Sequence, residues 1–143
     1  MRGTVVVDAS LATMWTIPGK QSPKALDMAD RWAKAGTDLL APSLILAETN
    51  NAVYKRVARG EMTIEVALKA LEIILGFGIE ISEQPGLQVS AMRLAHSLKR
   101  PTTYDCQYLA LAQSCHCDLW TGDRRFFNST HRRFPSVKWI GQV

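Results

Sequence analysis

The chain has 143 residues, of which 47% are hydrophobic and 21% charged, and its 17 basic and 13 acidic residues leave a formal net charge of +4. This length suffices for one domain with a buried core, and the composition excludes an extensively disordered chain. We therefore expect a single domain over residues 1–143, whose modest basic excess favours a polyanionic partner without establishing one.

The N-terminal sequence argues against a secreted or membrane-inserted protein. Only three consecutive valines precede Asp8, which is too short for a signal-peptide core or a membrane span. The cysteines are Cys106, Cys115 and Cys117. Their odd number and clustering are unlike the framework of a disulfide-rich secreted domain. We expect a cytoplasmic protein with reduced thiols and no membrane partner.

Hydrophobic periodicity and turn residues predict alternating strands and helices in the first half of the chain. The β-branched run at residues 4–8 predicts a strand, and a brief helix follows it and stops before Pro18. Further along, the pattern predicts a helix over 23–35, a strand over 38–42, a helix over 43–59 and a helix over 63–75. Ser43 is expected to cap the third of these helices, and Thr63 begins the fourth.

The second half continues the alternation. It predicts a strand over 79–82, a helix over 84–100, a helix over 104–115 capped by Thr103, a strand over 118–121, a turn and short helix over 122–128, and a strand over 137–141. Five short strands alternating with helices predict an α/β fold with a mainly parallel sheet covered by helices on both faces.

Four acidic residues fall where such a fold places its ligands. In open parallel sheets, ligands bind at the carboxyl ends of the strands. Asp8 ends the first strand, Asp123 follows the 118–121 strand, and Glu48 and Asp105 lie in the first turns of helices that start near the same edge. Each also has a purely structural interpretation, because acids near a helix N-terminus cap the helix or complement its dipole.

Together the four acids indicate a cation site. Carboxylates crowded into one cleft raise one another's pKa unless a positive group lies between them. Mg²⁺ and Mn²⁺ prefer oxygen ligands and are typically held by one or two carboxylates together with substrate phosphates. The sequence therefore suggests a pocket for Mg²⁺ or Mn²⁺ and a substrate that carries phosphate.

Four segments of the chain follow one another in the order "VVVDAS", "LAETNN", "TTYDCQYLALA" and "TGDRRFF". Together they resemble the PIN-domain nucleases, in particular VapC-type toxins of type II toxin–antitoxin systems. The resemblance implies a Rossmann-like three-layer α/β/α sandwich with a five-stranded sheet, Mg²⁺- or Mn²⁺-dependent endoribonuclease activity, a homodimer and a cognate antitoxin.

The same resemblance assigns site residues. It implies that the catalytic and metal-binding quartet consists of Asp8, Glu48, Asp105 and Asp123. Ser10 and Thr121 match the hydroxyl positions beside this quartet, where we expect them to support carboxylates or waters. We expect the first three acids to be the main ligands, and Asp123 to complete a second metal position or orient a water.

Two pairs of basic residues are candidate contacts to RNA phosphates. They are Arg124 with Arg125, directly after Asp123, and Lys55 with Arg56, two helical turns beyond Glu48. The alternative for each is a solvated basic face or an ion pair within a dimer.

Other functions compatible with this fold class have less support in the sequence. A haloacid dehalogenase-like phosphatase would carry a second aspartate two residues after Asp8, where this chain has Ser10. A PIN-domain nuclease that processes RNA without a toxin role, and a non-catalytic module that binds metal or a partner, stay open as alternatives. A zinc site at Cys115–Cys117 lacks a second ligand pair at zinc spacing.

Overall fold

The computed structural model describes residues 3–143, so the first two residues of the expected domain lie outside it. The strands are β1 (Thr4–Val7), β2 (Asp38–Ala41), β3 (Glu80–Ile81), β4 (Asp118–Thr121) and β5 (Val137–Trp139). The helices are α1 (Ala9–Thr13), α2 (Ser22–Ala35), α3 (Leu44–Ala58), α4 (Ile64–Leu75), α5 (Leu87–Ser97), α6 (Tyr104–Ser114) and α7 (Arg124–Thr130). A short 3₁₀ turn, Ile140–Gln142, follows β5.

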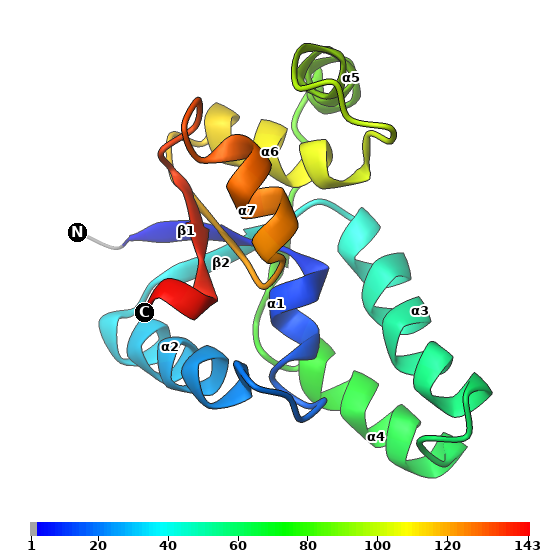
Figure 1. Ribbon diagram of the computed structural model, residues 1–143. Helices are drawn as coiled ribbons and strands as arrows, with labels where there is room; N and C mark the ends of the chain where they lie inside the picture. The colour runs from blue at the N-terminus through cyan, green and yellow to red at the C-terminus, as the bar shows by residue number, and fades with distance from the viewer. Residues whose placement is uncertain (1–2) are drawn as a thin grey trace.

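The five strands form one parallel sheet in the order β3-β2-β1-β4-β5. Figure 1 shows α5 and α6 on one side of this sheet and α2 and α4 on the other. The predicted α/β fold with helices on both faces is thus confirmed, and every strand pair is parallel. None of the helices within residues 3–143 is long and apolar enough to cross a membrane.

The central strand explains where the core lies. β1 is a run of β-branched residues, and Val5 to Val7 are buried because helices cover both faces of the sheet. Val6 pairs with Leu40 of β2 on one side and with Leu119 of β4 on the other. Leu109 and Leu111 of α6, a helix that packs against β1, are also fully buried.

The strand order places a topological switch point beside β1. From β1 the chain moves first toward β2 and β3 and later returns to β4 on the opposite side, so the direction of winding reverses between β1 and β4. Ligands of open parallel sheets bind at such a switch point, beyond the carboxyl ends of the strands. The Asp8 amide donates to the carbonyl of Trp120 over 3.2 Å, which sets the ends of β1 and β4 side by side.

Several element boundaries differ from prediction. The helix expected over 84–100 is shorter, because Gly86 precedes it with a left-handed φ of 81° and Lys99, at φ 55°, ends it. The last strand stops at Trp139, and Ile140–Gln142 turns into the 3₁₀ segment instead of extending the sheet. The strand expected over 79–82 keeps only two residues at the edge of the sheet.

Two predicted helix caps are wrong. Ser43 and Thr103 both have right-handed helical backbone angles and make no side-chain cap hydrogen bond. At Ser43 the backbone N–H donates instead to a carboxylate oxygen of Glu83 over 2.7 Å. Thr63, in contrast, has an extended backbone and accepts from the amide of Val66, as an N-cap should.

Candidate active site

Asp8 is the most enclosed of the predicted site acids. It follows β1 directly and caps α1, because its extended backbone lets the carboxylate turn back over the first turn of the helix. Its Oδ1 accepts from the Ser10 hydroxyl at 2.7 Å and from the Leu11 amide at 2.9 Å. Burial raises the pKa of Asp8 to about 6, against the opposing effect of hydrogen bonds from Thr121, Ser10 and Leu11.

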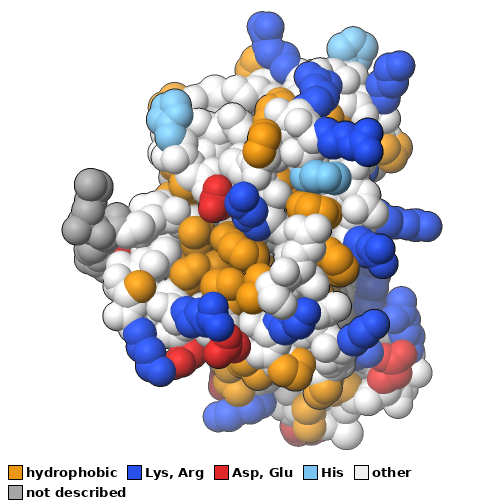
Figure 2. Space-filling model, turned by 60° about the vertical axis from the view of Figure 1, so that its left-hand side comes forward, with side chains coloured by type: hydrophobic (Ala, Val, Ile, Leu, Met, Phe, Trp, Pro, Cys, Tyr) orange, Lys and Arg blue, Asp and Glu red, His pale blue; other side chains and the backbone are white. Residues whose placement is uncertain are grey.

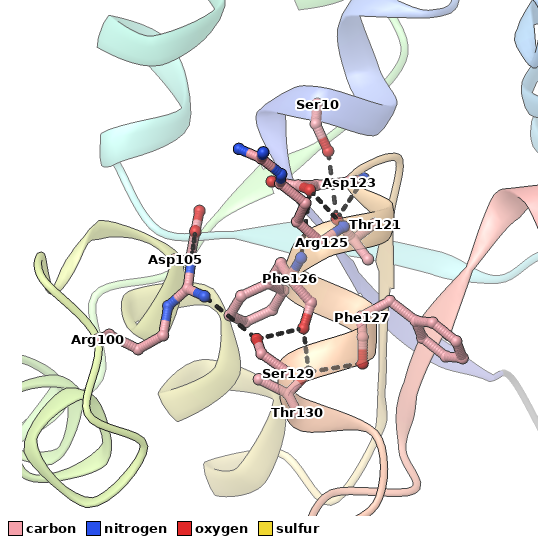
Figure 3. A network of polar contacts seen from close by, with 10 residues as sticks. All are labelled: Ser10, Arg100, Asp105, Thr121, Asp123, Arg125, Phe126, Phe127, Ser129 and Thr130. Carbon is pink, nitrogen blue, oxygen red and sulfur yellow. Dashed lines mark hydrogen bonds and ion pairs between the residues drawn. The ribbon is translucent and has the colours of Figure 1, made fainter.

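The predicted supporting hydroxyls join the ends of β1 and β4. The hydroxyl oxygens of Ser10 and Thr121 lie 3.2 Å apart. Ser10 Oγ also accepts from the Gly122 amide at 2.9 Å, and Thr121 Oγ1 accepts from the Asp123 amide at 3.0 Å. These contacts hold the turn after β4 against the turn after β1, as Figure 3 shows for Ser10, Thr121 and Asp123.

Asp123 has the capping role that its sequence context allowed. Its Oδ1 accepts from the amides of Arg125 at 2.9 Å and Phe126 at 3.2 Å, so it is the N-cap of α7. The residue is partly exposed. Capping uses only Oδ1 of Asp123. The helix-capping role is therefore compatible with a metal-binding role for Oδ2.

Glu48 is held by a residue that the sequence did not single out for the site. The hydroxyl of Tyr108 donates to Glu48 Oε1 over 2.6 Å, from α6 to α3. Tyr108 is only 1% exposed. Burial raises the pKa of Glu48, the Tyr108 hydrogen bond lowers it, and the nearby Asp105 raises it. Helical spacing could have indicated Tyr108 as a site residue, because it lies three residues after Asp105 and thus on the same face of α6.

Asp105 is paired with Arg100, the second residue that sequence reasoning missed. Arg100 Nη2 lies 3.0 Å from Asp105 Oδ2, and its Nη1 donates to Ser129 Oγ at 3.1 Å. The guanidinium also stands 5.3 Å from the ring centroid of Phe126. Figure 3 shows Arg100 reaching from the segment before α6 to both Asp105 and α7. The guanidinium is therefore held on three sides.

Asp105 is the electrostatic centre of the quartet. Burial raises its pKa most; the ion pair with Arg100 lowers it, and the charge of Asp123 raises it. Asp105 in turn raises the pKa of both Asp8 and Glu48. Asp8, Glu48 and Asp123 therefore each lie close enough to Asp105 for the two negative charges to repel. No three acidic, histidine or cysteine side chains within residues 3–143 are close enough to coordinate one ion in this arrangement.

The predicted phosphate-binding residues differ in their surroundings. Arg56 is paired with Glu61 at 3.0 Å, and the Arg124 guanidinium lies 5.3 Å from the ring centroid of Trp139. Lys55 and Arg125 have exposed side chains. Figure 2 shows Lys and Arg side chains spread over much of one face of the molecule. Exposure of a basic side chain alone therefore does not identify a phosphate contact, and its position relative to the four acids must be considered as well.

Comparisons with known proteins show the family and the fold. A family model for the PIN domain matches residues 24–136. The fold is similar to that of PAE2754 from Pyrobaculum aerophilum, with 24% identity, a TM-score of 0.71, and coverage of 99% of this chain and 94% of that one. It is also similar to VapBC2 from Rickettsia felis, solved bound to a DNA fragment from their promoter, with 16% identity, a TM-score of 0.68, and coverage of 95% and 96%. No curated protein matches the chain.

Proposed function

Since this chain belongs to the PIN-domain family, whose members are generally metal-dependent nucleases, we propose that it is an endoribonuclease that hydrolyses RNA phosphodiesters with Mg²⁺ or Mn²⁺. The observation that carries the proposal is the position of the four carboxyl groups beside the switch point of the sheet, where the ends of β1 and β4 meet and where α3 and α6 bring Glu48 and Asp105 alongside. Such a group of like charges favours a bound cation.

The donor atoms suit a hard divalent cation. All four proposed ligands are carboxylates, and the neighbouring Ser10 and Thr121 add only hydroxyl oxygens. Mg²⁺ retains several waters and needs only one or two direct carboxylate ligands, so three converging carboxylates are not required. Asp8, Glu48 and Asp105 would hold the ion directly or through water, and Asp123 would complete a second position or orient a water.

The chain's own residues prepare this site for phosphodiester hydrolysis. Ser10 and the Leu11 amide fix the carboxylate of Asp8, and Tyr108 fixes that of Glu48. Arg100 holds one oxygen of Asp105 and offsets part of the negative charge. A bound divalent cation would lower the pKa of the attacking water and neutralise charge on the phosphate. Pre-positioned ligands reduce the reorganisation that this chemistry demands.

We further propose that the nuclease is the toxin of a VapBC-type pair, acts in the cytoplasm, forms a homodimer and is neutralised by an antitoxin. The fold similarity to VapBC2 from Rickettsia felis supports this assignment. Large exposed apolar side chains, such as Tyr54, Leu68 and Met92, give the surface the character expected for protein partners. An RNA-processing nuclease without a toxin role is the second candidate.

Cleavage of a labelled RNA pool by purified protein tests the activity. We expect cleavage with Mg²⁺ or Mn²⁺, none with EDTA, and a loss of about 10²-fold or more in Asp8→Asn, because a ligand and its charge are removed. Asp27→Asn is the matched control, since Asp27 is exposed on α2 and forms an ion pair with Arg31 of the same helix. Equal cleavage by wild type and Asp8→Asn would remove the quartet from the mechanism.

Expression in a bacterial host separates the toxin from the processing nuclease. A toxin should arrest growth, and Asp105→Ala should relieve the arrest. A wild-type protein that cleaves RNA in vitro yet leaves growth unchanged would favour the processing role.

A further inference from the structure

A groove leads away from the proposed active site between α1 and α3. It has a volume of about 330 Å³, and its lining includes Ser10 and Thr13 of α1, Glu48, Asn51 and Lys55 of α3, and Arg59, which follows α3 as its C-cap. A second hollow of about 370 Å³ continues it, sharing Ser10 and Thr13 and adding Lys20, Gln21 and Arg56. One end of this groove therefore reaches two residues of the proposed site, and the other end is basic.

Polar and charged side chains follow one another at regular spacing along the α3 side of the groove. Asn51, Lys55 and Arg59 follow Glu48 at spacings of three, four and four residues, which places all of them along one face of the helix. At a rise of about 1.5 Å per residue, the series extends about 16 Å from Glu48. A chain lying in the groove would therefore meet a carboxylate first, then an amide, then two cations.

The cations of this series are available to a ligand. Lys55 and Arg59 are exposed, and neither forms an ion pair within residues 3–143, whereas Arg56 is held by Glu61. The lining combines hydroxyl, amide and basic groups with the methyl groups of Ala9 and Ala52. Exposed cations without an ion pair along a groove favour a polyanion with regularly spaced charges.

We propose that the α1–α3 groove binds the backbone of single-stranded RNA on one side of the cleaved bond, with Lys55 and Arg59 contacting phosphates and Asn51 hydrogen-bonding to the sugar–phosphate backbone. This inference rests on the proposed nuclease function and extends it by assigning a direction to the substrate. Contacts of this kind position a strand without reading its sequence. Arg124 and Arg125, on α7, lie outside this groove.

Binding of fluorescein-labelled single-stranded RNA in EDTA, followed by fluorescence anisotropy, tests the groove without cleavage. We expect Lys55→Gln and Arg59→Gln each to weaken binding roughly fivefold at every sequence tested and to reduce the slope of log affinity against log salt by about 0.7. The matched controls are Lys69→Gln on α4 and Arg93→Gln on α5, both exposed and outside the groove. They should bind RNA as the wild type does.

Cleavage kinetics provide a second measurement. With Mg²⁺, Lys55→Gln and Arg59→Gln should raise KM while leaving kcat unchanged, because they contact substrate away from the reacting bond. Circular dichroism should give all the variants the same thermal midpoint.

Three outcomes would overturn the inference. The first is a Lys55→Gln/Arg59→Gln double variant that binds RNA as tightly as the wild type does. The second is a loss of RNA affinity in the two control variants equal to that in the groove variants. The third is competition by polyglutamate as strong as that by RNA, which would assign the groove to an acidic protein segment. Failure of the nuclease proposal is a different result, namely absence of metal-dependent cleavage by wild type. These measurements therefore distinguish a protein that cleaves RNA without binding it in the groove from a protein that does not cleave RNA.

Discussion

At the scale of single residues, Glu48 and Asp105 share an arrangement that suits a metal ligand. One oxygen of Glu48 accepts from the Tyr108 hydroxyl, and one oxygen of Asp105 accepts from Arg100. Within residues 3–143, no hydrogen bond engages the second oxygen of either carboxylate. Partners that anchor one oxygen orient the other, and such outer partners are typically worth 10- to 100-fold in metal affinity.

Tyr108→Phe tests this arrangement, because it removes the hydroxyl and keeps the buried ring. We expect Mn²⁺ affinity, measured by isothermal titration calorimetry, to fall about tenfold, and stability to fall by about 1 kcal/mol. Tyr104→Phe is the control, since Tyr104 lies on the same helix and is 55% exposed. Unchanged Mn²⁺ affinity in Tyr108→Phe would mean that the tyrosine serves the core alone.

At the scale of elements, the turn between β4 and α7 is fitted closely to the turn after β1. A Cβ atom on Gly122 would stand 2.9 Å from the carbonyl oxygen of Ser10 and 2.6 Å from the terminal methyl carbon of Met14. The methionine can move, but the Ser10 carbonyl belongs to the backbone of α1. Glycine is therefore required here for space, and the close approach lets Ser10 Oγ accept from the Gly122 amide.

Gly122→Ala should separate these two turns. We expect a loss of about 1–3 kcal/mol in the free energy of unfolding, measured by urea denaturation, because the added methyl overpacks a backbone contact. Cleavage should fall as well, since Thr121 and Asp123 flank the displaced residue. Gly19→Ala is the control, because the contact of its Cβ within residues 3–143 would be an ordinary one, with Ser22 Oγ at 3.8 Å. Equal stability of both variants would show that the turn adjusts freely.

The end of α5 contains a residue whose backbone conformation reduces the stability of the folded state. Lys99 adopts a left-handed φ of 55°, and the next amide, from Arg100, donates to the carbonyl of Ala95 over 2.9 Å. A non-glycine residue in this conformation costs about 1 kcal/mol, so the helix ends here at some expense to stability. The turn starts the segment from which Arg100 reaches Asp105.

At the scale of the whole molecule, the fold encloses acidic groups that favour their neutral forms. The pKa of Asp8 rises from 3.8 to about 6 on folding, chiefly through burial. The folded state therefore holds this proton more tightly than the unfolded chain. The resulting stabilisation is fully present below pH 3.8 and is lost as the pH rises through about 6. Glu48 and Asp105, whose pKa values are also raised, act in the same direction.

Thermal unfolding of the metal-free protein should show this dependence. Without divalent cations, Asp8→Asn should be more stable than wild type at pH 7.5, by at most about 3 kcal/mol, and should lose this advantage near pH 4. Asparagine keeps an oxygen for the Ser10 and Leu11 hydrogen bonds and carries no charge. Mg²⁺ or Mn²⁺ at pH 7.5 should raise the midpoint of wild type and have little effect on the variant. A stability difference that is the same at both pH values would contradict the inferred burial effect.

Local patterns were sufficient to predict the order of elements and the edge on which the acids lie. Alternating strand and helix signals require parallel strands, and parallel strands bring their carboxyl ends to one edge, so Asp8 and Asp123 were placed correctly from neighbouring residues alone. Asp123 as a helix cap and Thr63 as the start of α4 were likewise local properties.

What the sequence by itself determined was thus the fold class, the edge and the candidate acids, because these follow from interactions between residues near in the chain. Only the tertiary structure decided that Tyr108 holds Glu48, across 60 residues, that Arg100 bridges Asp105 and α7, and that α1 and α3 enclose a groove. It also overruled Ser43 as a cap, since Ser43 has helical backbone angles and its hydroxyl makes no cap hydrogen bond. Contacts of this kind depend on how whole elements pack, and no spacing within one element encodes that packing.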